Sequence, residues 1–200
     1  MQTALSLKEE YEGHLVKIAR LTDEIEGYKH PHAVRIAALS DVVARRFNLA
    51  AHDRLALQQA ALVHDIGELA MSRDYLRANR RLTEEEILDL QRHPVIGEQE
   101  AAKNGLSRAV QLLVRWHHEW WNGGGYPDAL HREQIPLAAR ILRVADAYAA
   151  LTDSRPFRAA ISAHEARQYL IEWAGIEFDP QVVFMFLTLE GMKELESFAE

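Results

Sequence analysis

Apolar residues recur at helical spacing along almost the whole 200-residue chain, and this pattern constrains the fold more than any other feature. Residues 5–28 place apolar side chains three, four or seven positions apart, and residues 33–47 have a second amphipathic pattern. Residues 53–64, nearly all apolar toward their end, and residues 107–119 are expected to form further helices. No segment alternates polar and apolar residues as a half-buried strand would, and no hairpin signal occurs. The sequence therefore predicts an all-α fold.

Capping residues set the expected helix starts in the second half of the chain. Thr83 with Glu86, and Ser162 with Glu165, have the spacing of a capping box, which satisfies free backbone amides at a helix start. A long and mostly apolar helix is expected at residues 136–151. These signals divide the second half into several separate helices.

Two segments and the end of the chain complete the expected outline. Residues 66–82 contain Gly67 and several arginines and are expected to be irregular. Residues 120–127, WWNGGGYP, hold three consecutive glycines before Tyr-Pro, which predicts a loop. A last short helix is expected to close the chain.

The length of the chain fits one domain with its own hydrophobic core. We expect residues 1–25 to form an N-terminal helical leader and residues 26–200 to form a single helical bundle. The apolar spacing of the leader covers about three heptads. It could pair two copies in a homodimer or pack on its own domain, and the spacing leaves both alternatives open.

Composition excludes several classes of function. The formal net charge of −7 argues against binding to a nucleic-acid polymer. The absence of cysteine removes disulfides, thiolate metal sites and cysteine nucleophiles. No run approaches the roughly 20 apolar residues of a membrane span, and the first residues lack the order of a signal peptide. We therefore expect a cytoplasmic protein without a membrane span.

Ten histidines are present, and several stand beside carboxylates in apolar surroundings. His64-Asp65 ends a largely apolar helix, which costs free energy unless both groups find partners. A hydrogen-bonded helix terminus is the alternative explanation. Asp146 lies inside an apolar helix and needs a cation or a metal. An ion pair with Arg140 or Arg143 is the alternative there.

Further histidines extend this set of metal-ligand types. His117 and His118 are adjacent near a helix end, where both rings can converge on one point, although a solvated surface pair is the alternative. His32 and His93 each stand near a helix start. Imidazole and carboxylate without thiolate favour Fe, Mn, Co, Ni or Zn. Two such ions a few ångströms apart can clamp a phosphoryl group and generate hydroxide near neutral pH.

Four motifs together resemble a known family. They are HDIGE at 64–68, HPVIG at 93–97, HHEWWNGGGYP at 117–127 and RILRVADAYAALTDSRPFR at 140–158. Their order and spacing are similar to those of the HD-GYP domain family of the HD phosphohydrolase superfamily, from about residue 25 to about residue 185. The resemblance implies an HD-type helical bundle that hydrolyses the small molecule cyclic di-GMP with a hydroxide bridging two divalent metal ions. Fe or Mn is expected first, with Zn, Ni or Co as alternatives.

The resemblance also assigns roles to single residues. Asp65 would bridge the two metals and is the expected catalytic residue. The metal ligands that it implies are His32, His64, Asp65, His93, His117, His118 and Asp146. It further implies that Gly125, Tyr126 and Pro127 form the family's signature loop and that Arg155 contacts a phosphate. Tyr126 and Trp121 could flank a guanine, or brace the glycine-rich loop instead.

Several positions depart from the pattern that the resemblance implies. Glu68 stands where related sequences usually carry lysine, and Trp120 stands where they usually carry a basic residue. The loss of positive charge keeps two other functions open: hydrolysis of another nucleotide or cyclic dinucleotide, and a non-catalytic module that binds a cyclic dinucleotide. Some relatives hold a third metal through a glutamate four residues before the leading histidine. Tyr28 occupies that position here, so two metals are expected.

Overall fold

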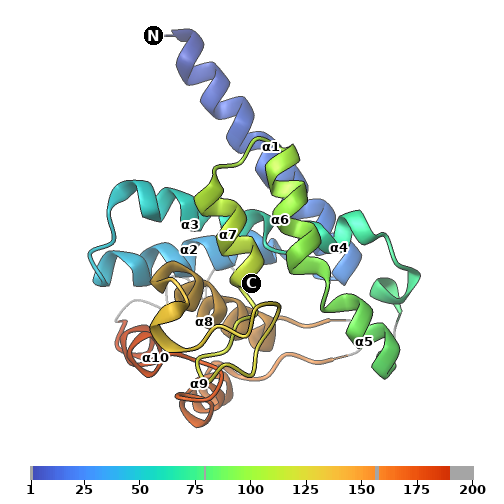
Figure 1. The fold of residues 1–200 in the computed structure, drawn as a ribbon, viewed down its shortest axis with the longest axis vertical. Coiled ribbons are helices and arrows are strands. Elements are labelled where there is room, and N and C mark those ends of the chain that lie inside the picture. Colours follow the sequence, from blue (N-terminus) through green and yellow to red (C-terminus); the bar gives the residue numbers. More distant parts are fainter. Residues whose placement is uncertain (1, 79, 156–157, 190–200) are drawn as a thin grey trace.

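The computed structural model describes residues 2–78, 80–155 and 158–189, and these residues form helices without a β-strand (Figure 1). The α-helices are α1 (Gln2–Glu26), α2 (His32–Arg46), α3 (Ala51–Val63), α4 (Ile66–Met71), α5 (Glu84–Leu90), α6 (His93–Lys103), α7 (Arg108–Trp116), α8 (Leu137–Thr152), α9 (Ala163–Glu172) and α10 (Pro180–Leu187). Two short 3-10 helices are η1 (Asp74–Arg77) and η2 (Arg132–Gln134). The predicted all-α fold is confirmed.

Helices α2, α3 and α8 form the centre of the bundle, where α2 packs against both of the others. Ile36 of α2, Leu57 of α3, and Leu142 and Tyr148 of α8 are among their fully buried side chains. Burial of one such side chain contributes about 1.5–3 kcal/mol to the free energy of unfolding. This packing fixes the end of α3 and the middle of α8, the two places from which His64 and Asp146 come.

The N-terminal half of helix α1 projects away from the rest of the molecule (Figure 1). Its C-terminal half packs on α2, α3 and α4, and it buries Leu15 and Ile18 in the common core. The division of the chain at residue 25 and the pairing of two copies through residues 1–25 stay predictions. None of the described helices, α1 included, is both long and apolar enough to cross a membrane.

The expected irregular segment at 66–82 contains two short helices, α4 and η1, so this prediction was wrong in part. Gly67, one of the residues on which that prediction rested, lies inside α4 against α6. Helix α7 ends at Trp116, three residues earlier than expected, and His117 follows it as the C-cap. The expected last short helix lies outside the described residues.

The two capping boxes are confirmed. The Thr83 hydroxyl accepts a hydrogen bond from the Glu86 amide, and the Glu86 carboxylate accepts one from the Thr83 amide. Ser162 and Glu165 make the same reciprocal pair. These bonds fix the starts of α5 and α9.

Candidate metal centre

The predicted metal ligands come from five helices and meet on one side of the bundle. They are His32 at the start of α2, His64 and Asp65 after α3, His93 at the start of α6, His117 and His118 after α7, and Asp146 within α8. All but Asp146 lie at helix ends, where the backbone changes direction. Their potential ligand atoms form two compact groups that share a border at Asp65.

The first group contains Asp65, His93, His117 and His118, whose ligand atoms all lie within 4.8 Å of one another. The Nε2 atoms of His93 and His117 are 3.1 and 3.3 Å from Oδ1 of Asp65. The same two nitrogens are 3.2 Å apart. One carboxylate oxygen and several imidazoles therefore surround a single point.

The second group contains His32, His64 and Asp146. Nε2 of His32 lies 3.8 Å from Oδ1 of Asp146, and Nε2 of His64 lies 2.8 Å from Oδ2 of Asp65. The two oxygens of Asp65 thus face different groups. This is the arrangement that a carboxylate shared between two cations requires.

The histidine rings are oriented by hydrogen bonds on their outer sides. Nδ1 of His64, His93 and His117 lies 2.9, 2.8 and 2.6 Å from the carbonyl oxygen three residues earlier in the chain. A carbonyl oxygen can only accept, so each Nδ1 carries a proton, and in the neutral form of each ring Nε2 holds the lone pair. That lone pair points toward the centre of the cluster, as in metal-binding histidines.

The cluster contains an excess of acceptors. Nε2 of His32, Nε2 of His64 and Oδ1 of Asp65 are buried and have no hydrogen-bond partner. The facing Nε2 atoms of His93 and His117 both present lone pairs, which repel each other without a positive charge nearby. Buried acceptors that lack donors are costly, and cations relieve that cost. The donor set therefore fits bound metal ions.

Asp153 supports this centre, and the sequence analysis missed it. Its Oδ2 accepts a hydrogen bond from Nδ1 of His32 at 2.8 Å, and its Oδ1 accepts one from Arg35 at 2.7 Å. The carboxylate follows the end of α8, 121 residues from His32 in the chain. Its position inside the last motif was the signal available, but nothing local links it to a particular histidine.

Arg143 also lies behind the ligands. It donates to Oδ2 of Asp146 at 3.1 Å and to Nδ1 of His118 at 3.3 Å, and it forms an ion pair with Glu177. Asp146 therefore forms the ion pair that the alternative explanation expected, but only through Oδ2. Its other oxygen, Oδ1, faces His32. Arg140 pairs with Asp179 instead.

The signature loop lies directly against the first ligand group. A Cβ at Gly125 would overlap the Trp120 amide nitrogen, so only glycine allows this approach of the two backbones. The ring of Tyr126 stacks on His118, with ring centroids 4.9 Å apart. The Tyr126–Pro127 peptide bond is cis. Gly125 and Pro127 shape the loop, and Tyr126 is the member of the motif that faces the ligands.

Glu119 braces the same loop. Its buried carboxylate accepts hydrogen bonds from the amides of Asp128 at 2.6 Å and Leu130 at 3.0 Å. Trp121, predicted to flank a guanine, lies elsewhere, because its ring packs under Arg140 at 5.6 Å. Within the described part of the chain, the residues that line the cavity at the ligands do not include Trp121. Its placement matches the alternative of a structural aromatic.

A cavity of about 300 Å³ opens beside the ligands. Asp65, His93, Asp146, Tyr126 and Arg155 are among the residues that line it. The guanidinium of Arg155 thus faces the same space as both ligand groups. An anion in this cavity would meet a cationic side chain opposite the ligand cluster.

Arg155 is held in place by the end of α1 and the segment after it. It lies 4.2 Å above the ring of Tyr28 and donates a hydrogen bond to the Tyr28 hydroxyl. Its Nη2 is 3.7 Å from Oε1 of Glu26. Tyr28 in turn stacks on His32, with ring centroids 3.7 Å apart. A continuous column of side chains therefore connects Arg155 to the first predicted metal ligand.

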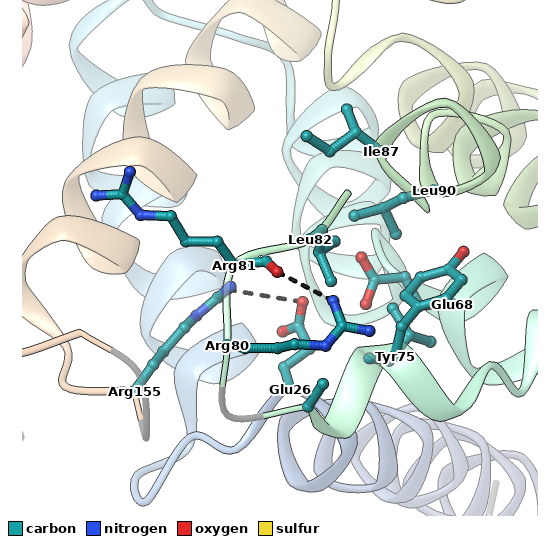
Figure 2. Close-up of a pocket in the computed structure, with 11 residues that line it drawn as sticks. Glu26, Glu68, Tyr75, Arg80, Arg81, Leu82, Ile87, Leu90 and Arg155 are labelled. Carbon is teal, nitrogen blue, oxygen red and sulfur yellow. Dashed lines mark hydrogen bonds and ion pairs between the residues drawn. The ribbon is translucent and has the colours of Figure 1, made fainter. Parts of the chain in front are cut away.

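A second cavity of about 410 Å³ adjoins the first, and Glu26, Glu68 and Arg155 line both (Figure 2). Burial and the nearby Asp65 carboxylate raise the pKa of Glu26 to about 7. Burial and the charge of Glu26 raise the pKa of Glu68 well above its usual value. These two acids stand in an environment that disfavours their charged forms.

The electrostatics within the ligand groups follow from the close pairing of His64 and Asp65. Burial alone would lower the pKa of His64, but the adjacent Asp65 carboxylate outweighs burial and raises it to about 10. Burial would raise the pKa of Asp65, but His64 and two further histidines lower it well below its usual value. Asp65 is therefore a carboxylate ion at neutral pH.

Comparisons with known proteins agree with this architecture. The chain matches the family described as "HD domain" over residues 13–182. It is 34% identical to the "Cyclic di-GMP phosphodiesterase response regulator RpfG" of Xanthomonas campestris pv. campestris over 91% of this chain and 48% of that protein. It is 32% identical to the "3'3'-cGAMP-specific phosphodiesterase 3" of Vibrio cholerae over 90% of this chain and 39% of that protein.

A solved structure shares the fold. The cyclic GMP-AMP-specific phosphodiesterase V-cGAP3 of V. cholerae superposes with a TM-score of 0.68 at 20% identity, over 92% of this chain and 49% of that one. The chain spans about half or less of each of these relatives.

Proposed function

Because the chain belongs to the HD domain family, we propose that it is a metal-dependent phosphodiesterase that hydrolyses a cyclic dinucleotide, with cyclic di-GMP as the first candidate. The observation that carries the proposal is the convergence of buried imidazole nitrogens and carboxylate oxygens that have no hydrogen donors to satisfy them. The names of the relatives support the substrate class, since they include cyclic di-GMP and 3'3'-cGAMP phosphodiesterases.

Two divalent ions, with Fe or Mn expected first, are proposed for the two ligand groups. His93, His117 and His118 would hold one ion, His32, His64 and Asp146 the other, and Asp65 would serve both. Bound there, such ions lower the pKa of a water molecule and neutralise charge on phosphoryl oxygens. The protein therefore needs no side-chain nucleophile for the cleavage of a phosphodiester.

The remaining side chains would bind and orient the substrate. Arg155 presents a guanidinium to the cavity, and a guanidinium can hold a phosphate by two parallel hydrogen bonds. Tyr126 offers a ring at the wall of the same cavity, where a base could stack. Asp153 and the carbonyls behind the histidines hold the Nδ1 protons on the outer sides of the rings, so that Nε2 is the atom directed at a metal.

Metal removal tests the proposal directly. Protein purified without oxygen should contain bound transition metal and hydrolyse cyclic di-GMP, and a chelator should abolish the activity. Because an ion at 100 times its dissociation constant adds about 2.7 kcal/mol to folding stability, chelation should also lower Tm. Mn²⁺ should restore both the activity and Tm. A chain that retains no metal and shows no change in Tm would contradict the proposal.

A substrate panel decides between the proposal and its rivals. Turnover of cyclic di-GMP, 3'3'-cGAMP, cyclic di-AMP and nucleoside phosphates should be compared under one metal-loaded condition. Hydrolysis of nucleoside phosphates alone would favour a different phosphohydrolase. Tight binding of a cyclic dinucleotide without turnover would instead favour a non-catalytic module.

We predict that Asp153→Asn weakens metal binding by about 10- to 100-fold, as loss of an outer carboxylate does. The amide can place an N–H toward Nδ1 of His32, which disturbs the tautomer that leaves Nε2 free for metal. Competition with a chelator measures the affinity. Asp53→Asn is the matched control, because Asp53 is an exposed aspartate beside His52, in the first turn of α3 and at the opposite end of that helix from His64. Equal affinities in the two variants would show that Asp153 does not orient His32.

A further inference from the structure

A buried acid without a partner faces the second cavity. Glu68, in the first turn of α4, is 6% exposed. Among the residues that the structure describes, neither a hydrogen bond nor an ion pair reaches its carboxylate. The neighbouring Glu26, by contrast, lies 3.7 Å from the guanidinium of Arg155. Because a buried carboxylate without donors is costly, Glu68 is suited to a ligand that brings hydrogen-bond donors to it.

The walls of this cavity fit a flat aromatic ligand. The cavity has a volume of about 410 Å³, and Leu82, Ile87 and Leu90 are among its apolar lining residues. Figure 2 shows the carboxylate of Glu68 directed into the space that these side chains surround. Arg80 lines the same cavity and adds a cationic donor. Apolar walls with one acid and one guanidinium match a nucleobase, which has apolar faces and a polar edge.

The position of the cavity beside the metal centre fits a substrate with two bases. The two adjoining cavities, of about 300 and 410 Å³, each lie low in the range of roughly 300–1,000 Å³ that ligand pockets span. Arg155, the proposed phosphate contact, lines both, so it stands where they meet. A cyclic dinucleotide carries a base on each side of its phosphates. With a phosphate at Arg155 and one base beside Tyr126, the other base would extend into the second cavity.

We propose that the second cavity binds one nucleobase of the cyclic dinucleotide and that Glu68 selects guanine there. The inference rests on the proposed function, which supplies the substrate class. The N1–H and 2-amino groups of guanine are adjacent donors that one carboxylate can accept together, and a guanidinium such as that of Arg80 can donate to O6 and N7. Adenine presents the acceptor N1 beside its one amino group, so its edge would set a lone pair against the carboxylate.

Cyclic di-IMP, which lacks only the 2-amino groups of cyclic di-GMP, tests the role of Glu68. We expect the metal-loaded wild type to favour cyclic di-GMP by about 10- to 100-fold in kcat/KM, as loss of a hydrogen bond to a charged group does. In Glu68→Gln the side-chain amide N–H₂ would oppose the 2-amino group, so this ratio should fall to about 3 or below. Glu100→Gln is the matched control, because Glu100 pairs with Lys103 at the surface, and it should keep the wild-type ratio.

A gain of turnover separates recognition from structural damage. A glutamine amide offers one donor and one acceptor, which match N1 and the amino group of adenine. The kcat/KM for cyclic di-AMP relative to cyclic di-GMP should therefore rise in Glu68→Gln. A merely damaged pocket would lower both values without reversing the preference.

Leu82→Trp tests the cavity independently of Glu68. The larger ring would occupy the place of the base, so KM for cyclic di-GMP should rise by at least about tenfold. Hydrolysis of bis(p-nitrophenyl) phosphate, a small phosphodiester that does not need the second cavity, should stay near the wild-type rate in both variants. A wild type that hydrolyses cyclic di-GMP and cyclic di-IMP equally well, or variants that keep the wild-type ratio and KM, would overturn the base site alone. A wild type that hydrolyses no cyclic dinucleotide would overturn the proposed function, and the base site with it.

Discussion

Asp65→Asn should reduce kcat for the cyclic dinucleotide by about 1000-fold or more, which corresponds to about 4 kcal/mol in the activation barrier. The two oxygens of this carboxylate face the two different ligand groups. An amide keeps its shape but loses the charge and replaces one acceptor oxygen with a donor. That N–H₂ can bind the lone pairs of His93 or His117 and hold the fold together, while the ligand is lost. Metal content should fall together with kcat.

A buried aspartate outside the centre provides the control for this variant. Asp41 in α2 is 7% exposed and pairs with Arg45 and Arg54. Asp41→Asn should lower the free energy of unfolding but leave metal content and kcat near wild type. If Asp65→Asn kept its metal and its activity, a shared carboxylate could not be the basis of the site.

Gly67→Ala should lower the free energy of unfolding by about 3 kcal/mol. An added Cβ would overlap the carbonyl oxygen of His93 and lie 2.8 Å from the amide nitrogen of Gly97. Both neighbours are backbone atoms, so they cannot turn aside as a side chain would. Helices α4 and α6 would have to separate, and Tm should fall by roughly 10 °C for a chain of this size.

Gly13→Ala is the matched control for this effect. Gly13 lies inside α1, and a Cβ there would meet nothing within 4 Å. Alanine in an exposed helix interior stabilises it by about 0.5–1 kcal/mol relative to glycine. The two substitutions add the same methyl group and should shift Tm in opposite directions. A small effect at Gly67 would mean that α4 and α6 can move apart at little cost. Metal content would then show whether His93 moves with them.

The helical fold was predictable because it depends on local patterns. Apolar spacing located most of the helices, and Thr83 and Ser162 located two starts through bonds that span three residues. The prediction failed where tertiary packing decides the local structure. Gly67 is a poor helix former in isolation, yet the close contact of α4 with α6 makes glycine the residue that fits.

The chemistry of the metal centre was partly predictable from residue types. Histidines and aspartates in apolar surroundings identified the residues that the structure gathers into two groups. The hydrogen-bond partners behind the ligands could not be predicted. Asp153 binds His32 from 121 residues away in the chain, and no short sequence pattern links the two. Trp121 misled for the opposite reason: it stands in sequence between His118 and Tyr126, which line the cavity, while its own ring packs under Arg140.

The inward direction of the imidazoles has a consequence for the life of the protein in a cell. The hydrogen bonds on the outer sides of the rings direct the Nε2 lone pairs toward one another even without a bound ion. The metal-free folded chain therefore carries unfavourable electrostatic repulsion. Ion binding would relieve that repulsion and raise stability by mass action. Scarcity of transition metal should therefore shorten the lifetime of the protein through proteolytic turnover.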